Sequence, residues 1–280
     1  MSDYRLIEVA PIAGACGAEI RGVDISRELD DAVVAEIRRA WLDHGVVFFR
    51  DQDVTPAQQL AFARRLGDPV EYPFVKGLDE FPEITPVVKL EHETVNFGGV
   101  WHSDTVYLPR PPMATMLYSR EIPPYGGDTE FANQALAYET LSDGLREMLD
   151  GLKAVNSAKK ADASKTREDR ARQAPGKADD VPDEVVHPVV RTHPETGRKA
   201  LYVNTGHTVR FEGWTEAESR PLLEYLYRHQ TRPELTCRFR WSLGALAFWD
   251  NRTVQHYPLN DYHGFRRVMH RITLAGDVPY

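Results

Sequence analysis

The pair His102 and Asp104, together with His256 far downstream, constrains the fold of this chain more than any other feature. On an extended segment, side chains two residues apart point to the same side, so His102 and Asp104 can converge on one ion. The fold then has to bring His256 to the same point from another strand. Two imidazoles and one carboxylate on one face of a metal form the facial triad of non-haem Fe(II) sites, which leaves coordination positions open for chemistry.

Other interpretations of these three residues stay open. A His-x-Asp tripeptide is common by chance, and a partly buried histidine hydrogen-bonded to a nearby carboxylate explains it without a metal. The same three ligands also suit Zn²⁺ with a bound water, the arrangement of a hydrolase. A non-catalytic binding protein with a β-sandwich fold would need no facial triad at all.

Two arginines near the C-terminus indicate an anion site. From residue 266 to 275 the sequence alternates and favours a strand, so Arg267 and Arg271 should share one face of it. Burying both is unfavourable unless anions meet them, and guanidinium groups bind carboxylates and sulfonates through two parallel bonds. The alternative is a charged edge strand whose arginines face solvent.

Composition narrows the class of protein. With 280 residues and 42% hydrophobic content, the chain can bury a large core, and a single domain over 1–280 is normal for a β-barrel or sandwich. The net charge of −8 argues against nucleic acid as a partner. Cys16 and Cys237 stand far apart in the sequence, which excludes a cysteine zinc cluster and fits a reducing compartment. The sequence shows neither an apolar signal region nor a membrane span, so we expect no membrane partner and a cytoplasmic location.

The hydrophobic pattern predicts a β-rich core with several helices. Helices are expected from residue 31 up to Gly45, at 56–66, at 135–152 in two pieces that break near Ser142, and from Thr215 through Leu226. Strands are expected at 46–49, 113–118, 189–191, 200–203, 237–241 and 245–249. The segment 157–183 has almost no large apolar residue, and it is either a solvated, disordered insertion or a lid over the pocket.

Several separate motifs in one order together resemble the taurine dioxygenase family of Fe(II)- and 2-oxoglutarate-dependent oxygenases, which also includes alkylsulfatases and aryloxyalkanoate dioxygenases. The motifs are 17–24, 47–52, Trp101–Asp104, Gly126–Thr129, Trp249–Arg252 with His256, and Arg267 with Arg271. The resemblance runs over nearly the whole chain. It implies an α+β fold in which helices surround a jelly-roll core, the double-stranded β-helix.

The resemblance also implies roles for individual residues. His102, Asp104 and His256 fall where the family binds iron. Thr129 and Arg267 fall where it holds the distal carboxylate of 2-oxoglutarate. Arg271 matches the arginine that binds the anionic group of the substrate.

The rest of the substrate pocket departs from the taurine-specific pattern. Tyr72 stands in the region where the taurine enzyme presents a histidine and a tyrosine, Gly98 replaces an asparagine, and His207 replaces a phenylalanine. We therefore expect a small organic anion other than taurine, such as a sulfonate, an alkyl sulfate or a carboxylate. The family reaction uses O2 to hydroxylate a C–H bond and yields succinate and CO2. Because Asp104 occupies the position that a halide would need, halogenation is disfavoured, while desaturation, cyclisation and a homo-oligomer stay open.

Overall fold

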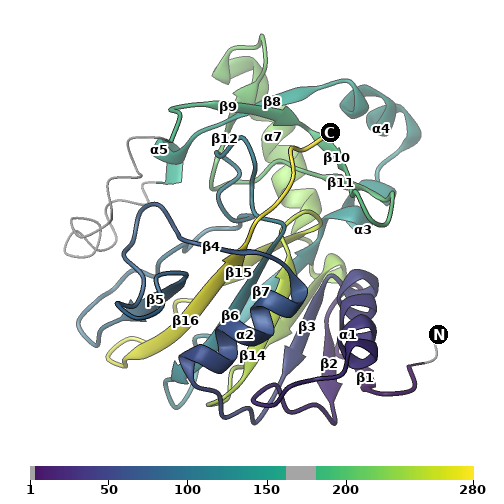
Figure 1. Ribbon diagram of the computed structural model, residues 1–280. Helices are drawn as coiled ribbons and strands as arrows, with labels where there is room; N and C mark the ends of the chain where they lie inside the picture. The colour runs from purple at the N-terminus through teal and green to yellow at the C-terminus, as the bar shows by residue number, and fades with distance from the viewer. Residues whose placement is uncertain (1–3, 162–180) are drawn as a thin grey trace.

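The computed structural model describes residues 4–161 and 181–280, and a large twisted sheet forms its centre (Figure 1). Along this sheet the strands follow the order β1 (Glu8–Pro11), β2 (Ala18–Arg21), β3 (Val46–Phe49), β14 (Leu246–Asp250), β6 (Ala114–Glu121), β16 (Arg267–Leu274) and β4 (Pro69–Val70), and β5 (Ile84–Lys89) also pairs with β16. All of these pairs are antiparallel except β2 with β3.

Two helices cover one face of the large sheet, α1 (Asp31–His44) and α2 (Pro56–Leu66) (Figure 1). The second begins where the sequence predicts, because Thr55 and Gln58 form a capping box and Pro56 occupies the first helical position. The first ends at Gly45, whose φ of 73° suits a residue without a Cβ. Trp41 of α1 packs against Phe248 of β14 at 4.7 Å between ring centroids, which joins this helix to the sheet.

A smaller sheet packs on the opposite face of the large one. Its order is β13 (Thr236–Phe239), β7 (Thr129–Asn133) and β15 (Val254–Pro258). Phe48 of the large sheet stacks on Phe239 of the small one at 4.1 Å, and Phe131 lies 5.6 Å from Trp249. The two sheets therefore enclose an apolar layer, and the candidate site residues lie where this layer ends.

The remaining elements form a second body of structure beside these sheets, at the top of Figure 1. They are α3 (Gln134–Glu139), α4 (Asp143–Asp150), β8 (Lys153–Asn156), α5 (Ala158–Ala161), β9 (Val185–Pro188), β10 (Val190–Thr192), β11 (Lys199–Leu201), β12 (Thr208–Phe211), α7 (Glu216–Gln230) and the 3-10 turn η2 (Pro233–Leu235). Their buried apolar side chains form a separate cluster that includes Phe211, Leu226 and Val203.

Most elements expected from the sequence are confirmed. The two-piece helix at 135–152 divides into α3 and α4 around Ser142, and the helix after Thr215 has the expected capping box with Glu218. The charged-edge interpretation of Arg267 and Arg271 is wrong, because β16 is flanked by β6 on one side and by β4 and β5 on the other, and both arginines are buried. The predicted lid or insertion at 157–183 falls mostly on residues 162–180, which lie outside the described residues.

Candidate active site

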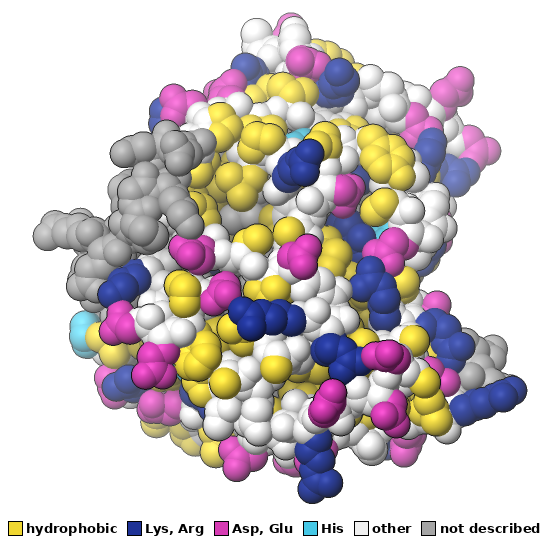
Figure 2. Space-filling view, in the orientation of Figure 1, with side chains coloured by type: hydrophobic (Ala, Val, Ile, Leu, Met, Phe, Trp, Pro, Cys, Tyr) yellow, Lys and Arg dark blue, Asp and Glu magenta, His cyan; other side chains and the backbone are white. Residues whose placement is uncertain are grey.

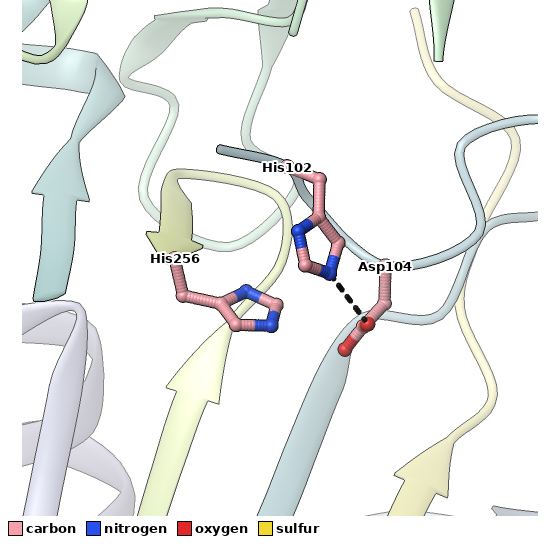
Figure 3. A group of neighbouring side chains, drawn as sticks. All are labelled: His102, Asp104 and His256. Carbon is pink, nitrogen blue, oxygen red and sulfur yellow. Dashed lines mark ion pairs between the residues drawn. The ribbon is translucent and has the colours of Figure 1, made fainter. Parts of the chain in front are cut away.

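His102, Asp104 and His256 meet at one point, although they come from distant parts of the chain. Their ligand atoms all lie within 4.8 Å of one another, and all three residues are buried. His256 belongs to β15, and a single antiparallel bridge joins it to His102: His102 N donates to His256 O at 3.2 Å and His256 N donates to His102 O at 2.9 Å. Figure 3 shows the three side chains converging, with His102 Nε2 at 3.7 Å from Asp104 Oδ1.

Asp104 reaches this point through a turn, which corrects the expectation of an extended segment. Only His102 of the pair takes part in strand pairing, and the chain turns from Asp104 onward. The next residue, Thr105, has φ of 44°, a region that β-branched residues rarely adopt. The Asp104 amide is held by Asn251, whose Oδ1 accepts its N–H at 3.3 Å. Strain at Thr105 therefore accompanies the placement of the carboxylate.

A buried chain of hydrogen bonds orients the Asp104 carboxylate. Thr115 Oγ1, on β6, donates to Asp104 Oδ2 at 2.6 Å, and Asn251 Nδ2 donates to Thr115 Oγ1 at 2.9 Å. Trp249 Nε1 in turn donates to Asn251 Oδ1 at 2.9 Å. Because Oδ2 is engaged by Thr115, Oδ1 is the oxygen that faces His102.

The protonation states of the triad suit a divalent metal. Burial opposes ionisation of Asp104, but its interactions with His256 and Arg271 outweigh burial and lower its pKa to about 2. Burial, followed by the interaction with His102, lowers the pKa of His256 to about 3, and burial also lowers the pKa of His102. A carboxylate and two neutral imidazoles are the forms that bind metals.

The hydrogen bonds of the two imidazoles also fit a metal. His102 Nδ1 lies 2.7 Å from Val100 O, which leaves Nε2 directed at the Asp104 carboxylate. His256 Nδ1 is buried without a hydrogen-bond partner among the described residues. These donors match the nitrogen and oxygen ligands of a non-haem Fe(II) centre.

Thr129 and Arg267 come together at a second point. Thr129 opens β7 and Arg267 opens β16, and both are buried beside Trp241. Trp241 Nε1 donates to Thr129 Oγ1 at 3.0 Å, and its ring centre lies 5.5 Å from Arg267 Cζ. Arg267 Nε and Nη2 have no hydrogen-bond partner in the described part of the chain, and burial lowers the Arg267 pKa. Because a hydroxyl that accepts can also donate, Thr129 adds a donor to those of Arg267, and this point offers several donors to an anion.

Arg271 lies on the same strand as Arg267, and its side chain reaches the triad. Its Nη1 is 3.8 Å from Asp104 Oδ1, and its guanidinium carbon is 4.2 Å from the ring centre of Tyr72 and 5.7 Å from that of Phe97. Its Nε is buried and has no partner among the described residues. An anion bound to Arg271 would therefore lie directly beside the candidate metal site.

The three other sequence-predicted pocket residues surround the same place. The hydroxyls of Tyr72 and Tyr107 are 3.5 Å apart, and the His207 ring lies 4.9 Å from Tyr107 and 5.9 Å from His102. Burial, then the field of His102, lowers the pKa of His207 to about 3, so this imidazole is neutral. Gly98 has φ of 69°, and a Cβ there would lie 2.8 Å from His102 Cε1. Any side chain at position 98 would thus push on a candidate metal ligand.

Sequence reasoning missed several residues of this site. Tyr107, Phe97 and Thr115 contact the predicted residues, but none has a local pattern that distinguishes it from a core residue. Trp241 was identified only as part of a strand. Asn251 belongs to the Trp249–Arg252 motif, and the structure shows that its side-chain oxygen accepts the N–H of Asp104.

A buried ion-pair network supports the loop that leads to His256. Arg252 donates from Nε and Nη2 to Asp250 at 2.8 and 2.6 Å, and from Nη1 to Glu195 at 2.9 Å. His193 Nε2 lies 3.0 Å from the same Asp250 carboxylate. This network ties the turn between β14 and β15 to the neighbouring body of structure.

The two-sheet fold and the two-histidine, one-carboxylate cluster define a class: metal-dependent enzymes with open positions at a single metal site. The comparisons with known proteins are more specific. The model of the taurine catabolism dioxygenase TauD, TfdA family matches residues 8–273, and the chain belongs to this family.

Known relatives agree with this assignment over nearly the whole of this chain. An alpha-ketoglutarate-dependent sulfate ester dioxygenase of Pseudomonas putida is 40% identical over 98% of this chain and 91% of its own, and an alkylsulfatase of Acinetobacter baylyi is 36% identical over 97% and 86%. The crystal structure of a taurine dioxygenase from Burkholderia xenovorans has a TM-score of 0.84 and 40% identity over 98% of this chain and 91% of its own. The chain is thus an α+β oxidoreductase, a dioxygenase that uses Fe(II), 2-oxoglutarate and O2.

Proposed function

We propose that this dioxygenase hydroxylates an alkyl sulfate ester or a closely related organic anion at the carbon next to the anionic group. The observation that carries the proposal is the position of Arg271, a buried guanidinium 3.8 Å from Asp104 Oδ1 with aromatic rings around it. A guanidinium recognises the oxygens of a sulfate, sulfonate or carboxylate. Its neighbours Tyr72, Phe97 and Tyr107 offer apolar surface to the alkyl part.

Two observations favour sulfate esters as the substrates. Two relatives that match almost the whole chain are described as acting on sulfate esters or as alkylsulfatases. Tyr72, Gly98 and His207 also differ from the taurine-specific residues, so the pocket should accept a group of different shape. Hydroxylation of the carbon that bears the sulfate gives an unstable intermediate, which collapses to an aldehyde and free sulfate.

Each site residue has a proposed role in this reaction. His102, Asp104 and His256 hold Fe(II), which supplies the oxidant that removes a hydrogen atom from the substrate once 2-oxoglutarate and O2 are bound. Thr129 and Arg267 hold the distal carboxylate of 2-oxoglutarate. Arg271 binds the substrate anion and directs the adjacent carbon at the metal. Tyr72, Gly98 and His207 shape the remaining wall.

We also propose that the two packed sheets, with α1 and α2 outside them, form a double-stranded β-helix, and that the chain is one catalytic domain. The low cysteine content is the basis for the proposed reducing, cytoplasmic location; the two cysteines are buried, with their Sγ atoms 3.5 Å apart. Among the described residues, no helix is long and apolar enough to cross a membrane.

The face in Figure 2 mixes Lys and Arg side chains with Asp and Glu side chains. This face therefore does not present the basic surface that a polyanion such as a nucleic acid would need.

A substrate panel tests the proposal. Succinate release should be faster with medium-chain alkyl sulfates than with taurine, and Arg271→Ala should lose this activity while it keeps its affinity for 2-oxoglutarate. Taurine as the best substrate, or an Arg271→Ala enzyme that is fully active on the best anion, would contradict the proposal.

A further inference from the structure

Lys89, the last residue of β5, is a buried cation, and none of the roles proposed so far involves it. Its side chain is only 5% exposed, and its Nζ has no hydrogen-bond partner in the described part of the chain. The acidic group that acts on it is Glu93, whose carboxylate accepts the Leu90 amide at 2.5 Å. A buried ammonium without a hydrogen-bond partner is unfavourable, so its presence requires an explanation.

The sheet places Lys89 directly opposite Arg267. These two residues are register partners in the antiparallel pair of β5 and β16, and such partners project from the same face with Cβ atoms about 4.5–5.5 Å apart. Both flank Tyr262. Lys89 Nζ lies 4.0 Å from the centre of the Tyr262 ring. Arg267 lies near the same ring, because Tyr262 Cδ1 and Arg267 Cδ are 3.1 and 3.4 Å from one point beside Gly127, the position that a Cβ on this glycine would take.

The electrostatics of this pair favour an anion. Burial lowers the pKa of Lys89; the charge of Glu93 opposes this shift, and the positive charge of Arg267 adds to it. Arg267 is itself buried, with two nitrogens that have no partner among the described residues. The two positive charges repel each other where both groups are buried, and one carboxylate close to both would relieve the desolvation and the repulsion.

We propose that Lys89 is a second cationic ligand of the distal carboxylate of 2-oxoglutarate, acting with Arg267 from the neighbouring strand. The inference rests on the proposed role of Arg267 in cosubstrate binding. Thr129 and Arg267 then bind one side of the carboxylate, and the Lys89 ammonium lies on the side of Tyr262. Arg271 remains free for the substrate anion because it faces Asp104.

The proposal predicts two effects of opposite sign for Lys89→Met. In the ligand-free protein the variant removes a buried charge that has no hydrogen-bond partner among the described residues, so its melting temperature should rise or stay the same. In the loaded protein it removes a charge-assisted contact, so the affinity for a 2-oxoglutarate analogue should fall roughly tenfold. A residue that only fills space would not produce this combination.

Calorimetric titration of the Mn(II)-loaded protein with N-oxalylglycine in the absence of O2 tests the inference without turnover. Lys89→Met should bind the analogue about tenfold more weakly than wild type, and Lys89→Arg should recover part of the loss. The matched control is Lys76→Met, which removes a half-exposed lysine paired with Asp79 at 2.6 Å and should change nothing. With 2-oxopentanoate, which lacks the distal carboxylate, wild type and Lys89→Met should bind equally.

Arg267→Ala separates failure of this inference from failure of the proposed function. If Arg267→Ala binds N-oxalylglycine weakly but both Lys89→Met and Lys89→Gln bind it normally, Lys89 does not contact the cosubstrate and the inference is overturned. If Arg267→Ala also binds normally, the distal carboxylate lies elsewhere and the proposed residue roles fail as well. An equal loss of 2-oxopentanoate affinity in Lys89→Met would likewise overturn the inference, because it would indicate a general disturbance of the pocket.

Discussion

Replacing Thr115 by valine should weaken metal binding although Thr115 is not a candidate ligand. The substitution keeps the shape of the side chain and removes the hydroxyl that donates to Asp104 Oδ2 at 2.6 Å and accepts from Asn251 Nδ2 at 2.9 Å. A buried hydrogen bond to a carboxylate is worth about 1.5–3 kcal/mol, which corresponds to roughly 10- to 150-fold in an equilibrium constant. Loss of a residue that orients a metal ligand typically reduces metal affinity by about 10- to 100-fold. We therefore expect the dissociation constant for the metal to rise at least tenfold.

Anaerobic titration with Mn(II) against a competing chelator measures this constant directly. Thr115→Ser is the matched control, because it keeps the hydroxyl and should bind the metal almost as well as wild type. The melting temperature of the metal-free protein is recorded in parallel to separate an effect on ligand orientation from a general loss of stability. Wild-type metal affinity in Thr115→Val would refute the reasoning, and so would an equal loss in Thr115→Ser.

Two further perturbations follow from the site. Arg267→Ala should raise the apparent Michaelis constant for 2-oxoglutarate roughly tenfold or more. Arg267→Lys should recover only part of this affinity, because an ammonium cannot bind a carboxylate in the bidentate geometry of a guanidinium. Steady-state assays of succinate formation measure both effects. Asp250 should stabilise the fold above about pH 4. Burial raises its pKa, but the interactions with Arg252 and His193 outweigh burial and lower the pKa from 3.8 to about 2. Its contribution, of order 2 kcal/mol, should vanish as the pH falls toward 2. Asp250→Asn should thus unfold more easily in urea at pH 7 and show a weaker acid dependence; a wild-type profile would contradict this.

The parts of the site that sequence predicts are those with a local pattern. His102 and Asp104 are two residues apart, and Arg267 and Arg271 are four residues apart on one face of an alternating strand. The order of the motifs along the chain is similar to that of one family. Helix ends were predicted because capping residues such as Thr55 act within a few residues of their own backbone. These signals are short-range, so a single sequence contains them.

The parts that sequence missed depend on contacts across the fold. Thr115 contacts Asp104 only because β6 lies next to the turn that follows His102. Trp241 contacts Thr129 only because the preceding strand, β13, pairs with β7. Lys89 looks like the ordinary polar end of an apolar strand until its register with Arg267 is known. The turn at Asp104 was missed because Thr105 adopts a backbone conformation that its residue type disfavours.

The most direct test of the account is the stoichiometry of turnover with a medium-chain alkyl sulfate. We expect one succinate and one sulfate for each aldehyde formed, a requirement for Fe(II), 2-oxoglutarate and O2, and no coupled turnover in Asp104→Ala. Sulfate released without 2-oxoglutarate or O2, with Zn²⁺ supporting the reaction, would instead identify a hydrolase. Unchanged succinate formation in Asp104→Ala would contradict the assignment of the metal site.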